Sequence, residues 1–395
     1  MDFVDEYYAD KDLSPLKKLT LVIPTYNRNY YLSRCLWYHA HFPFGQIIVA
    51  DSSPEEKKVV NRETVAKIRE MFGANILYLE YEPETEKYGE DIYQKWADAV
   101  KHSKKEYTKI CTDKEFVIPD VVCECINYLD EHLDYGTADA VSLECCYCST
   151  NINKTIWNIW TPGDLEYSNN NTIERCKDAL NAQKQRMSAW NLLTAIRRTD
   201  NYNYIYSKLQ EYSLLDIRFG DVFLQFISII CSKRKRISTK YYLIRDLSGL
   251  YDANGNMIPA ESSSSRYPSL DTYIINGVID DKIKNLRALV YELLSLNNNS
   301  GSNHSKHTDE ITTTYLKTIG IRFPNNPTIN KLYAILRYVY NRYPLLHNII
   351  NGRAVYRFDS RQIIEIDLSI HKELDVINKI IVNSISNQKL DIPIV

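Results

Sequence analysis

Residues 18–28 read KLTLVIPTYNR, an apolar run that passes through Pro24 into a polar turn. The run is continuously apolar rather than alternating, which is typical of a strand covered on both faces, as in a parallel sheet. Residues 29–40 follow the turn and have the pattern of a helix. A buried strand, a polar turn and a helix in succession form the building unit of α/β folds, so this stretch sets the fold class.

Strands and helices continue to alternate from this stretch to residue 148. Further strands are expected at 46–50, 75–80, 107–111 and 138–146, and helices at 55–72, 91–101 and 120–132. Alternation of this kind predicts an α/β fold with a mostly parallel sheet flanked by helices.

The second half of the chain is richer in helical patterns. Helices are expected at 177–198, 203–212 and 221–233, a strand at 236–245, and an Asn-rich loop over the site at 150–175. A run of serines marks a linker. We therefore expect a first domain over residues 1–255, a linker over 256–268, and a mainly helical C-terminal region over 269–395 with a polar loop at 297–307.

Composition excludes several classes of protein. The 395 residues carry 48 Lys+Arg against 50 Asp+Glu, and this balance gives no support for non-specific binding to nucleic acid. The hydrophobic content of 44% rules out a mainly disordered chain. The acidic N-terminus lacks the pattern of a signal peptide, and no apolar run reaches the roughly 18–20 residues that span a bilayer. We expect a cytoplasmic protein.

The nine cysteines are expected to be free thiols, because their number is odd and no signal peptide precedes them. Only Cys145 and Cys148 have the spacing of a structural zinc site, and a second pair is missing. Buried thiols are therefore favoured over zinc.

Three polar strand exits carry the main functional signal. They lie at residues 24–28, 51–53 and 113–115. Ligands of α/β folds bind outside the carboxyl ends of the strands, so all three exits should face one crevice. In the third exit, Asp113 and Glu115 offer two carboxylates of the kind that hard divalent cations prefer. A solvated turn is the alternative for this triplet.

The segments VIPTYNR, IIVADSS and CTDKEFVIPD occur in this order, each at a strand exit. Together they resemble the GT-A nucleotide-sugar glycosyltransferases, particularly the inverting family 2 type, over residues 18–250. The resemblance implies a Rossmann-like GT-A domain that binds a UDP-linked sugar, with Asp51 reaching the base or the ribose. The residues expected at the nucleotide sugar are Pro24, Thr25, Tyr26, Asn27, Arg28, Asp51, Ser52, Lys95, Lys114 and Arg245.

The same resemblance implies that Asp113 and Glu115 hold Mn²⁺ or Mg²⁺ on the donor diphosphate. Two departures from the family pattern are Lys114 in the middle of the acidic triplet and Glu115 in place of Asp. Lys114 could pair with a donor phosphate and partly replace the cation, or it could point to solvent. A metal-independent enzyme and a non-catalytic protein therefore both stay open.

The resemblance further implies a general base at the start of a helix about 100 residues beyond the metal motif. Asp221, in the segment RFGDVFL, fits that position. Its alternative role is that of a helix N-cap, and Asp216 is the competing base.

The reaction expected from the resemblance is transfer of a sugar, with inversion, to a hydroxyl of a glycan, a lipid-linked sugar, a protein or a modified base in DNA. A nucleotidyltransferase is the rival enzyme, but PTYNRNYY has no glycine for a phosphate loop. Trp157, Trp160 and Trp190 lie in or near the expected acceptor region.

Residues 331–350 form a basic, aromatic stretch without an acid. Such a helix could lie on a membrane surface, giving a peripheral location, or against a second copy of the chain. An ordinary core helix is the favoured alternative, because Pro344 interrupts the stretch.

Overall fold

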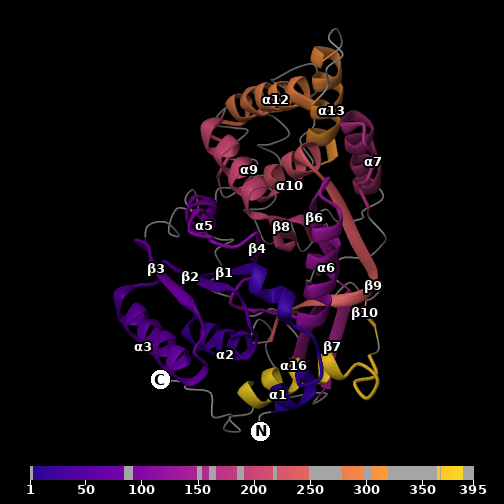
Figure 1. Cartoon of the computed structure of the whole chain (residues 1–395). Helices are drawn as coiled ribbons and strands as arrows, with labels where there is room; N and C mark the ends of the chain where they lie inside the picture. Colours follow the sequence, from indigo (N-terminus) through magenta and orange to yellow (C-terminus); the bar gives the residue numbers. More distant parts are fainter. Residues whose placement is uncertain are drawn as a thin grey trace, which may run out of the picture.

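The computed structural model describes residues 3–83, 92–148, 154–159, 166–184, 191–216, 220–248, 278–297, 304–318, 363–364 and 366–385. Its strands form one 10-stranded sheet with the order β10-β7-β6-β8-β4-β1-β2-β3, while β9 pairs with β6 and β5 pairs with β9 (Figure 1). The strands are β1 (Leu19–Thr25), β2 (Gln46–Asp51), β3 (Ile76–Glu80), β4 (Tyr107–Ile110), β5 (Glu115–Val117), β6 (Tyr135–Cys148), β7 (Lys154–Ile159), β8 (Ile196–Arg198), β9 (Lys233–Asp246) and β10 (Ile363–Ile364).

The parallel part of the sheet consists of β3, β2, β1 and β4. β1 pairs in parallel with both β2 and β4, and β2 pairs in parallel with β3. The other half is mixed, because β8, β7, β5 and β10 all pair antiparallel while β6 and β9 run parallel. The predicted α/β class is confirmed, and its parallel character is concentrated in the half that carries the three strand exits.

Helices cover both faces of the sheet and bury two hydrophobic clusters. The described helices are α1 (Phe3–Tyr8), η1 (Ser14–Lys18), α2 (Asn29–Ala40), α3 (Glu55–Phe72), α5 (Ile92–Lys101), α6 (Pro119–Glu131), α7 (Thr172–Lys184), α8 (Asn191–Thr194), α9 (Thr199–Glu211), α10 (Gly220–Cys231), α12 (Val278–Asn297), α13 (His304–Thr318) and α16 (Lys372–Ile385). Leu21 and Ile23 of β1 join the cluster under α2 and α6, whereas Val22 faces α5 and α10. This two-sided burial explains the continuous apolarity of β1.

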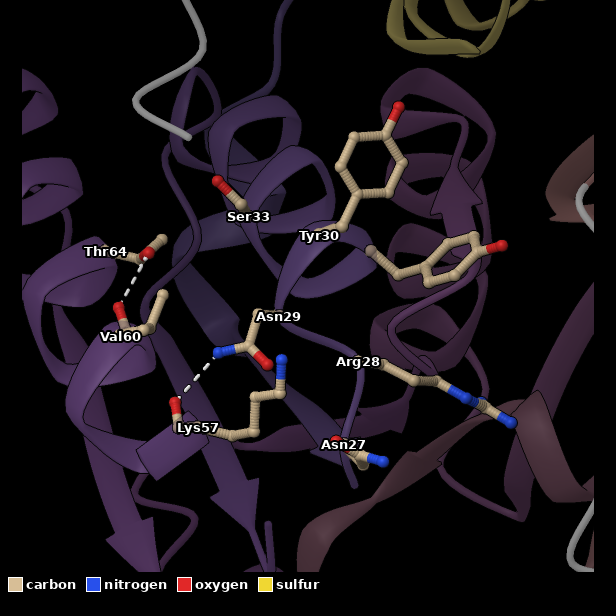
Figure 2. Close-up of a pocket in the computed structure, with 9 residues that line it drawn as sticks. Asn27, Arg28, Asn29, Tyr30, Ser33, Lys57, Val60 and Thr64 are labelled. Carbon is tan, nitrogen blue, oxygen red and sulfur yellow. Dashed lines mark hydrogen bonds between the residues drawn. The ribbon is translucent and has the colours of Figure 1, made fainter. Parts of the chain in front are cut away.

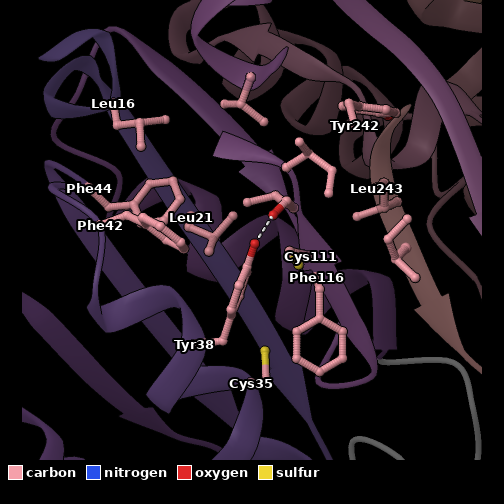
Figure 3. Packing of buried hydrophobic residues seen from close by; sticks show 14 of the residues in the cluster. Leu16, Leu21, Cys35, Tyr38, Phe42, Phe44, Cys111, Phe116, Tyr242 and Leu243 are labelled. Carbon is pink, nitrogen blue, oxygen red and sulfur yellow. Dashed lines mark hydrogen bonds between the residues drawn. The ribbon is translucent and has the colours of Figure 1, made fainter. Parts of the chain in front are cut away.

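The cluster on the α2 side also supports the acidic turn that follows β4 (Figure 3). Tyr38 of α2 donates a hydrogen bond of 2.8 Å to the carbonyl of Val117 in β5, and its ring packs edge-on against Phe116. Both residues are fully buried. Helix α2 therefore fixes the segment immediately after Asp113 and Glu115.

Two sequence expectations in the middle of the chain are wrong. Residues 154–159 lie in the expected loop but form strand β7, and residues 196–198 end an expected helix but form strand β8. β7 is paired with β6 and β10, and β8 bridges β4 and β6. Partners on both sides stabilise short strands that local sequence pattern does not specify.

The described helices beyond residue 269 complete both clusters. α12 and α13 pack with α10 and α7, and they contribute Leu286, Leu289 and Tyr315 to the cluster on that side. α16 contacts α1 at the opposite end of the molecule (Figure 1), where Tyr7 donates a hydrogen bond of 3.4 Å to Glu373. The expected linker at 256–268 and the basic stretch at 331–350 lie outside the described residues.

The described cysteines other than Cys148, whose side chain lies outside the description, are free thiols, as predicted. Among the described helices, none combines the length and the apolarity needed to cross a bilayer.

Candidate functional site

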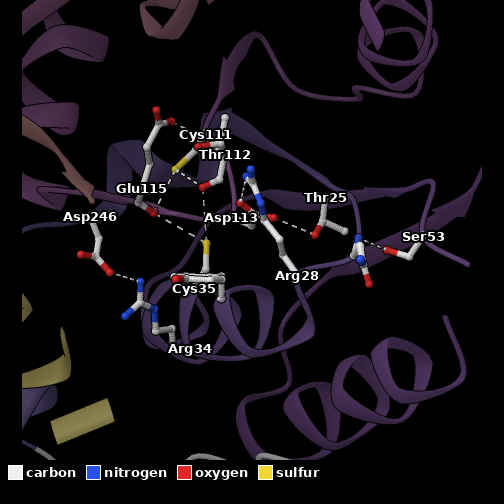
Figure 4. A network of polar contacts seen from close by, with 12 residues as sticks. Thr25, Arg28, Arg34, Cys35, Ser53, Cys111, Thr112, Asp113, Glu115 and Asp246 are labelled. Atoms are coloured by element: carbon white, nitrogen blue, oxygen red, sulfur yellow. Dashed lines mark hydrogen bonds and ion pairs between the residues drawn. The ribbon is translucent and has the colours of Figure 1, made fainter. Parts of the chain in front are cut away.

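The exits of β1 and β4 meet at the carboxylate of Asp113 (Figure 4). Thr25, the last residue of β1, donates from Oγ1 to Oδ2 of Asp113 at 2.8 Å, and Arg28 donates from Nη1 to Oδ1 at 3.2 Å. Asp113 is 1% exposed, whereas the Arg28 side chain is 44% exposed. The structure thus brings three of the expected site residues together, with a guanidinium at the edge towards solvent.

The exit of β2 joins the same place through Asn27. This residue has a φ of 54°, in the left-handed region that Asn tolerates better than most non-glycine residues. Its backbone N–H donates to Oγ of Ser53 at 2.8 Å, and the N–H of Ser52 donates to the carbonyl of Thr25 at 3.3 Å. These two hydrogen bonds therefore hold the polar turns after β1 and β2 together.

Asp51, which was expected at the base or the ribose, is fully buried at the end of β2. Its carboxylate accepts hydrogen bonds from the backbone of Ser53, from Asn61 of α3 and from Tyr78 of β3, at 2.7, 2.7 and 2.5 Å. Because three donors of this chain surround it, the Asp51 carboxylate stabilises the turn after β2 from within the core.

Lys95 extends from α5 to the ends of β1 and β2. It is 2% exposed, and its Nζ donates to Oγ of Ser52 at 2.8 Å and to the carbonyl of Thr25 at 3.3 Å. An ammonium at this point adds positive charge beneath the ends of β1 and β2.

Glu115 lies close to Asp113 in sequence, but its carboxylate has a different environment. Its Oε2 accepts the backbone N–H of Thr112 at 2.8 Å, and the residue is 1% exposed. Its carbonyl accepts weak hydrogen bonds from the thiols of Cys35 and Cys111, at 3.6 and 3.4 Å (Figure 4). The Glu115 carboxylate therefore stabilises the turn at residues 112–115 by accepting a hydrogen bond from its backbone.

Lys114 does not point freely to solvent, because the residue is only 6% exposed. Its Nζ lies 4.1 Å from the ring centre of Tyr31, a cation–π distance. Burial lowers the pKa of Lys114 to about 8, and the positive charge of Arg28 acts in the same direction. Beneath it, Asp246 forms a fully buried ion pair with Arg34 and donates its N–H to the Lys114 carbonyl at 2.8 Å.

These residues do not fit a divalent cation as they are arranged. Both oxygens of Asp113 have partners on this chain, and one partner is a guanidinium. The Glu115 carboxylate is bound to a backbone amide, and Lys114 stands between the two acids. Within the described ranges, no three His, Cys, Asp or Glu side chains are grouped to hold a metal ion.

Arg245 lies on β9, the strand that pairs with β5 at the end of this turn. In the sheet register it stands between Glu115 of β5 and Glu144 of β6, and its Nη1 is 3.9 Å from Oε1 of Glu144. Burial raises the pKa of Glu144. Arg245 is thus held in a row of polar side chains across the sheet.

The expected base lies at the first turn of α10. The helix begins at Gly220, whose N–H donates to the carbonyl of Asp216 at 2.7 Å, and Asp221 is its second residue. The Asp221 side chain lies outside the described part of the structure. The competing base, Asp216, is buried and forms an ion pair of 2.9 Å with Lys282 of α12.

Helix α5 contacts both the start of α10 and the ends of β1 and β2. An added Cβ at Gly220 would lie 2.5 Å from the Tyr93 ring, so the ring packs directly on the backbone of Gly220. Two residues further along α5, Lys95 contacts the ends of β1 and β2. One helix therefore contacts both the proposed donor end and the segment that carries the expected base.

A cavity of about 280 Å³ lies beside the N-terminus of α2 (Figure 2). Its lining includes Asn27, Arg28, Tyr31 and Lys57, and Asn29 donates to the Lys57 carbonyl at 2.8 Å. Sequence reasoning missed Tyr31 and Lys57. The pair Tyr30-Tyr31, close after Arg28 at the start of the expected helix, was the signal that could have identified Tyr31.

Comparisons with known proteins give fold likenesses only. No family model matches the chain, and no curated protein matches it. The crystal structure of S. aureus TarS 1–349 in complex with UDP-GlcNAc is similar over 94% of this chain and 92% of that one, at 13% identity and a TM-score of 0.45. Against a longer TarS structure the chain spans 43% of that protein's length, at 15% identity and a TM-score of 0.42.

A second likeness is to the mannosyltransferase PcManGT from Pyrobaculum calidifontis, solved in complex with GDP-Man and Mn²⁺. It covers 97% of this chain and 93% of that one, at 10% identity and a TM-score of 0.39.

Proposed function

We propose that this protein is a glycosyltransferase that moves a sugar from a nucleotide-sugar donor to an acceptor hydroxyl. The observation that supports this most directly is the meeting of the β1, β2 and β4 exits, in which Thr25 and Arg28 both bind Asp113. In α/β folds the carboxyl ends of parallel strands are the usual place for a nucleotide. The three sequence segments that resemble GT-A enzymes supply these same contacts.

The nucleoside, uridine in our proposal, lies over the ends of β1 and β2, near Pro24, Tyr26 and Ser52. Its diphosphate lies towards Arg28, where Lys95 adds positive charge from below the strand ends. Arg245 is assigned to the sugar end of the donor, since it lies on β9 beside β5. The Mn²⁺ or Mg²⁺ that the resemblance implies does not fit Asp113 and Glu115 as they are arranged, and no step below uses a metal ion.

Asp221 acts as the general base. As the acceptor oxygen attacks the anomeric carbon, its proton passes to the Asp221 carboxylate. The bond from that carbon to the diphosphate oxygen breaks with its electron pair, so the nucleoside diphosphate leaves and the anomeric centre inverts. Asp221 is favoured over Asp216, whose carboxylate is engaged with Lys282. The N-terminus of α10 favours an ionised carboxylate at this position.

The first test is nucleoside diphosphate release from a panel of UDP- and GDP-linked sugars. Asp221→Asn should lower turnover by about 10²–10⁴, the usual weight of general base catalysis, while donor affinity stays unchanged. Asp216→Asn is the matched control. It should lower the stability of the protein, because it breaks the ion pair with Lys282, and it should affect turnover much less. A fall of less than tenfold in Asp221→Asn would assign that residue to helix capping instead.

Binding without turnover of any donor would favour the non-catalytic alternative. The acceptor stays open among a glycan, a lipid-linked sugar, a protein and a modified base in DNA. A contact of the C-terminal region with a membrane or a second copy of the chain also remains a proposal.

A further inference from the structure

We propose that Arg28 and Lys114 together take the place of a divalent cation at the donor diphosphate, so that donor binding needs no metal. This inference rests on the proposed function, because it concerns how the same crevice receives the charged half of a nucleotide sugar. It reverses the expectation that Asp113 and Glu115 ligate Mn²⁺ or Mg²⁺.

The first support is that the carboxylates of Asp113 and Glu115 already accept hydrogen bonds from this chain. A metal ion at Asp113 would have to displace Arg28 from Oδ1 or Thr25 from Oδ2, and Asp113 is 1% exposed. A metal ion at Glu115 would break its hydrogen bond to the Thr112 amide. Hard cations bind where several oxygens are available at once, and neither acid offers that here.

The second support is the sign of the surrounding charge. The Arg28 guanidinium contacts Asp113, and the Lys114 ammonium is held against the Tyr31 ring in the same turn. Arg34 lies deeper, and its charge is balanced by Asp246. A divalent cation placed beside Asp113 would be repelled by both Arg28 and Lys114, whereas a diphosphate would be attracted by both.

The third support is the fit of these two side chains to a diphosphate. A guanidinium can present two parallel N–H donors to phosphate oxygens, and an ammonium adds a compact charge for the next phosphate. The Arg28 side chain is 44% exposed and lines the cavity beside α2, so it can reach a ligand from its present position.

Lys114 is positioned by the end of β9. Asp246 donates its N–H to the Lys114 carbonyl at 2.8 Å, and the Asp246 carboxylate is fixed by Arg34. The Tyr31 hydroxyl, in turn, donates to the carbonyl of Ser248 at 3.1 Å, so the ring beneath the ammonium is also anchored. The ammonium is therefore preorganised, which lowers the entropic cost of holding a phosphate.

The experiment is calorimetric titration of the full chain with UDP and with GDP, in EDTA and in Mn²⁺. The wild type should bind one of them with the same Kd, within about twofold, in both conditions. Lys114→Met should weaken that binding by about 10- to 100-fold in EDTA, the usual weight of a hydrogen bond to a charged group. Lys240→Met, an exposed lysine on β9, is the matched control and should bind like the wild type.

A second variant makes the test specific for the cation. Lys114→Asp places an acid in the middle of the triplet, so it should bind poorly in EDTA and recover at least about tenfold in Mn²⁺. Wild-type binding that requires Mn²⁺, with Lys114→Met unaffected, would overturn this inference and leave the proposed function intact. Absence of nucleotide binding in both conditions would instead overturn the proposed function. Circular dichroism of each variant verifies that the chain is folded.

Discussion

The Arg34–Asp246 ion pair is the most deeply buried charged contact around the site. The two side chains are 1% and 0% exposed, and the Arg34 guanidinium also lies over the rings of Tyr31 and Phe116. Desolvation of two charges consumes much of their attraction, so such a pair adds little net stability, although removing one partner is costly. The pair fixes the relative position of α2 and the end of β9, and with it the backbone of Lys114.

Asp246→Asn is expected to lower the free energy of unfolding by about 3–5 kcal/mol, because it leaves the Arg34 charge buried without its carboxylate. The double variant Arg34→Met, Asp246→Leu should regain most of that loss, since it removes both charges. Urea denaturation measures both effects. Lys240→Met, which breaks an exposed ion pair with Glu124, is the control and should change stability by less than about 1 kcal/mol. If Asp246→Asn changed the free energy of unfolding as little as Lys240→Met, the structural role assigned to the Arg34–Asp246 pair would be contradicted.

At the scale of elements, the start of α10 is set by its contact with α5. Gly220 has no side chain, so Tyr93 can pack directly on its backbone. α5 also contacts the turn before α10, where Gln94 donates to the Leu215 carbonyl at 3.5 Å. The position of Asp221 therefore depends on the packing of these two helices.

Gly220→Ala should cost about 1–3 kcal/mol of stability, because its Cβ would meet the Tyr93 ring at 2.5 Å. If Asp221 is the base, turnover should fall as well, since the start of α10 must shift. Combining the change with Tyr93→Leu removes the clash, so a double-mutant cycle should show coupling of about 1 kcal/mol or more. Independent, additive effects would show that the two residues do not meet. Gly73→Ala is a useful contrast, because it meets open space and is strained only by its φ of 63°.

Sequence pattern predicted β1 and β2, whose burial is two-sided and continuous, and the one-sided helix α3 to within a residue or two. It failed at β7 and β8, because a strand of a few residues is specified by the strands beside it rather than by its own sequence. The same limit applies to the site. The sequence indicated that Thr25, Arg28 and Asp113 would meet, but not that Asn61 and Tyr78 would enclose Asp51. Those contacts depend on the rotation of α3 and the register of β3.

At the scale of the whole molecule, two hydrophobic clusters on opposite faces of the sheet both need the C-terminal helices. Leu289 of α12 lies in the cluster with α10, and Ile380 of α16 lies in the cluster with α2 and α6. Both side chains are fully buried. The clusters thus cross the domain boundary expected at residue 269.

A chain that ends after Ser262 is expected to be insoluble or strongly destabilised, because it lacks α12, α13 and α16. Leu289→Ala and Ile380→Ala in the full chain should each cost about 2–5 kcal/mol, measured by thermal or urea unfolding. Leu296→Ala, at an exposed position of α12, is the control and should have little effect. A soluble, nucleotide-binding fragment 1–262 would show that the C-terminal helices fold as a separate unit.

The contact between α1 and α16 also has a consequence for how the protein is made. Tyr7 and Glu373 are separated by 366 residues of chain. At the roughly 5–20 residues per second of protein synthesis, α1 leaves the ribosome about 20–70 seconds before its partner helix is made. During that interval α1, which buries Val4 and Tyr8 in the finished protein, lacks its contact with α16. Helix α1 therefore reaches its final packing only after α16 has been made, and the nascent chain must stay unaggregated during that interval.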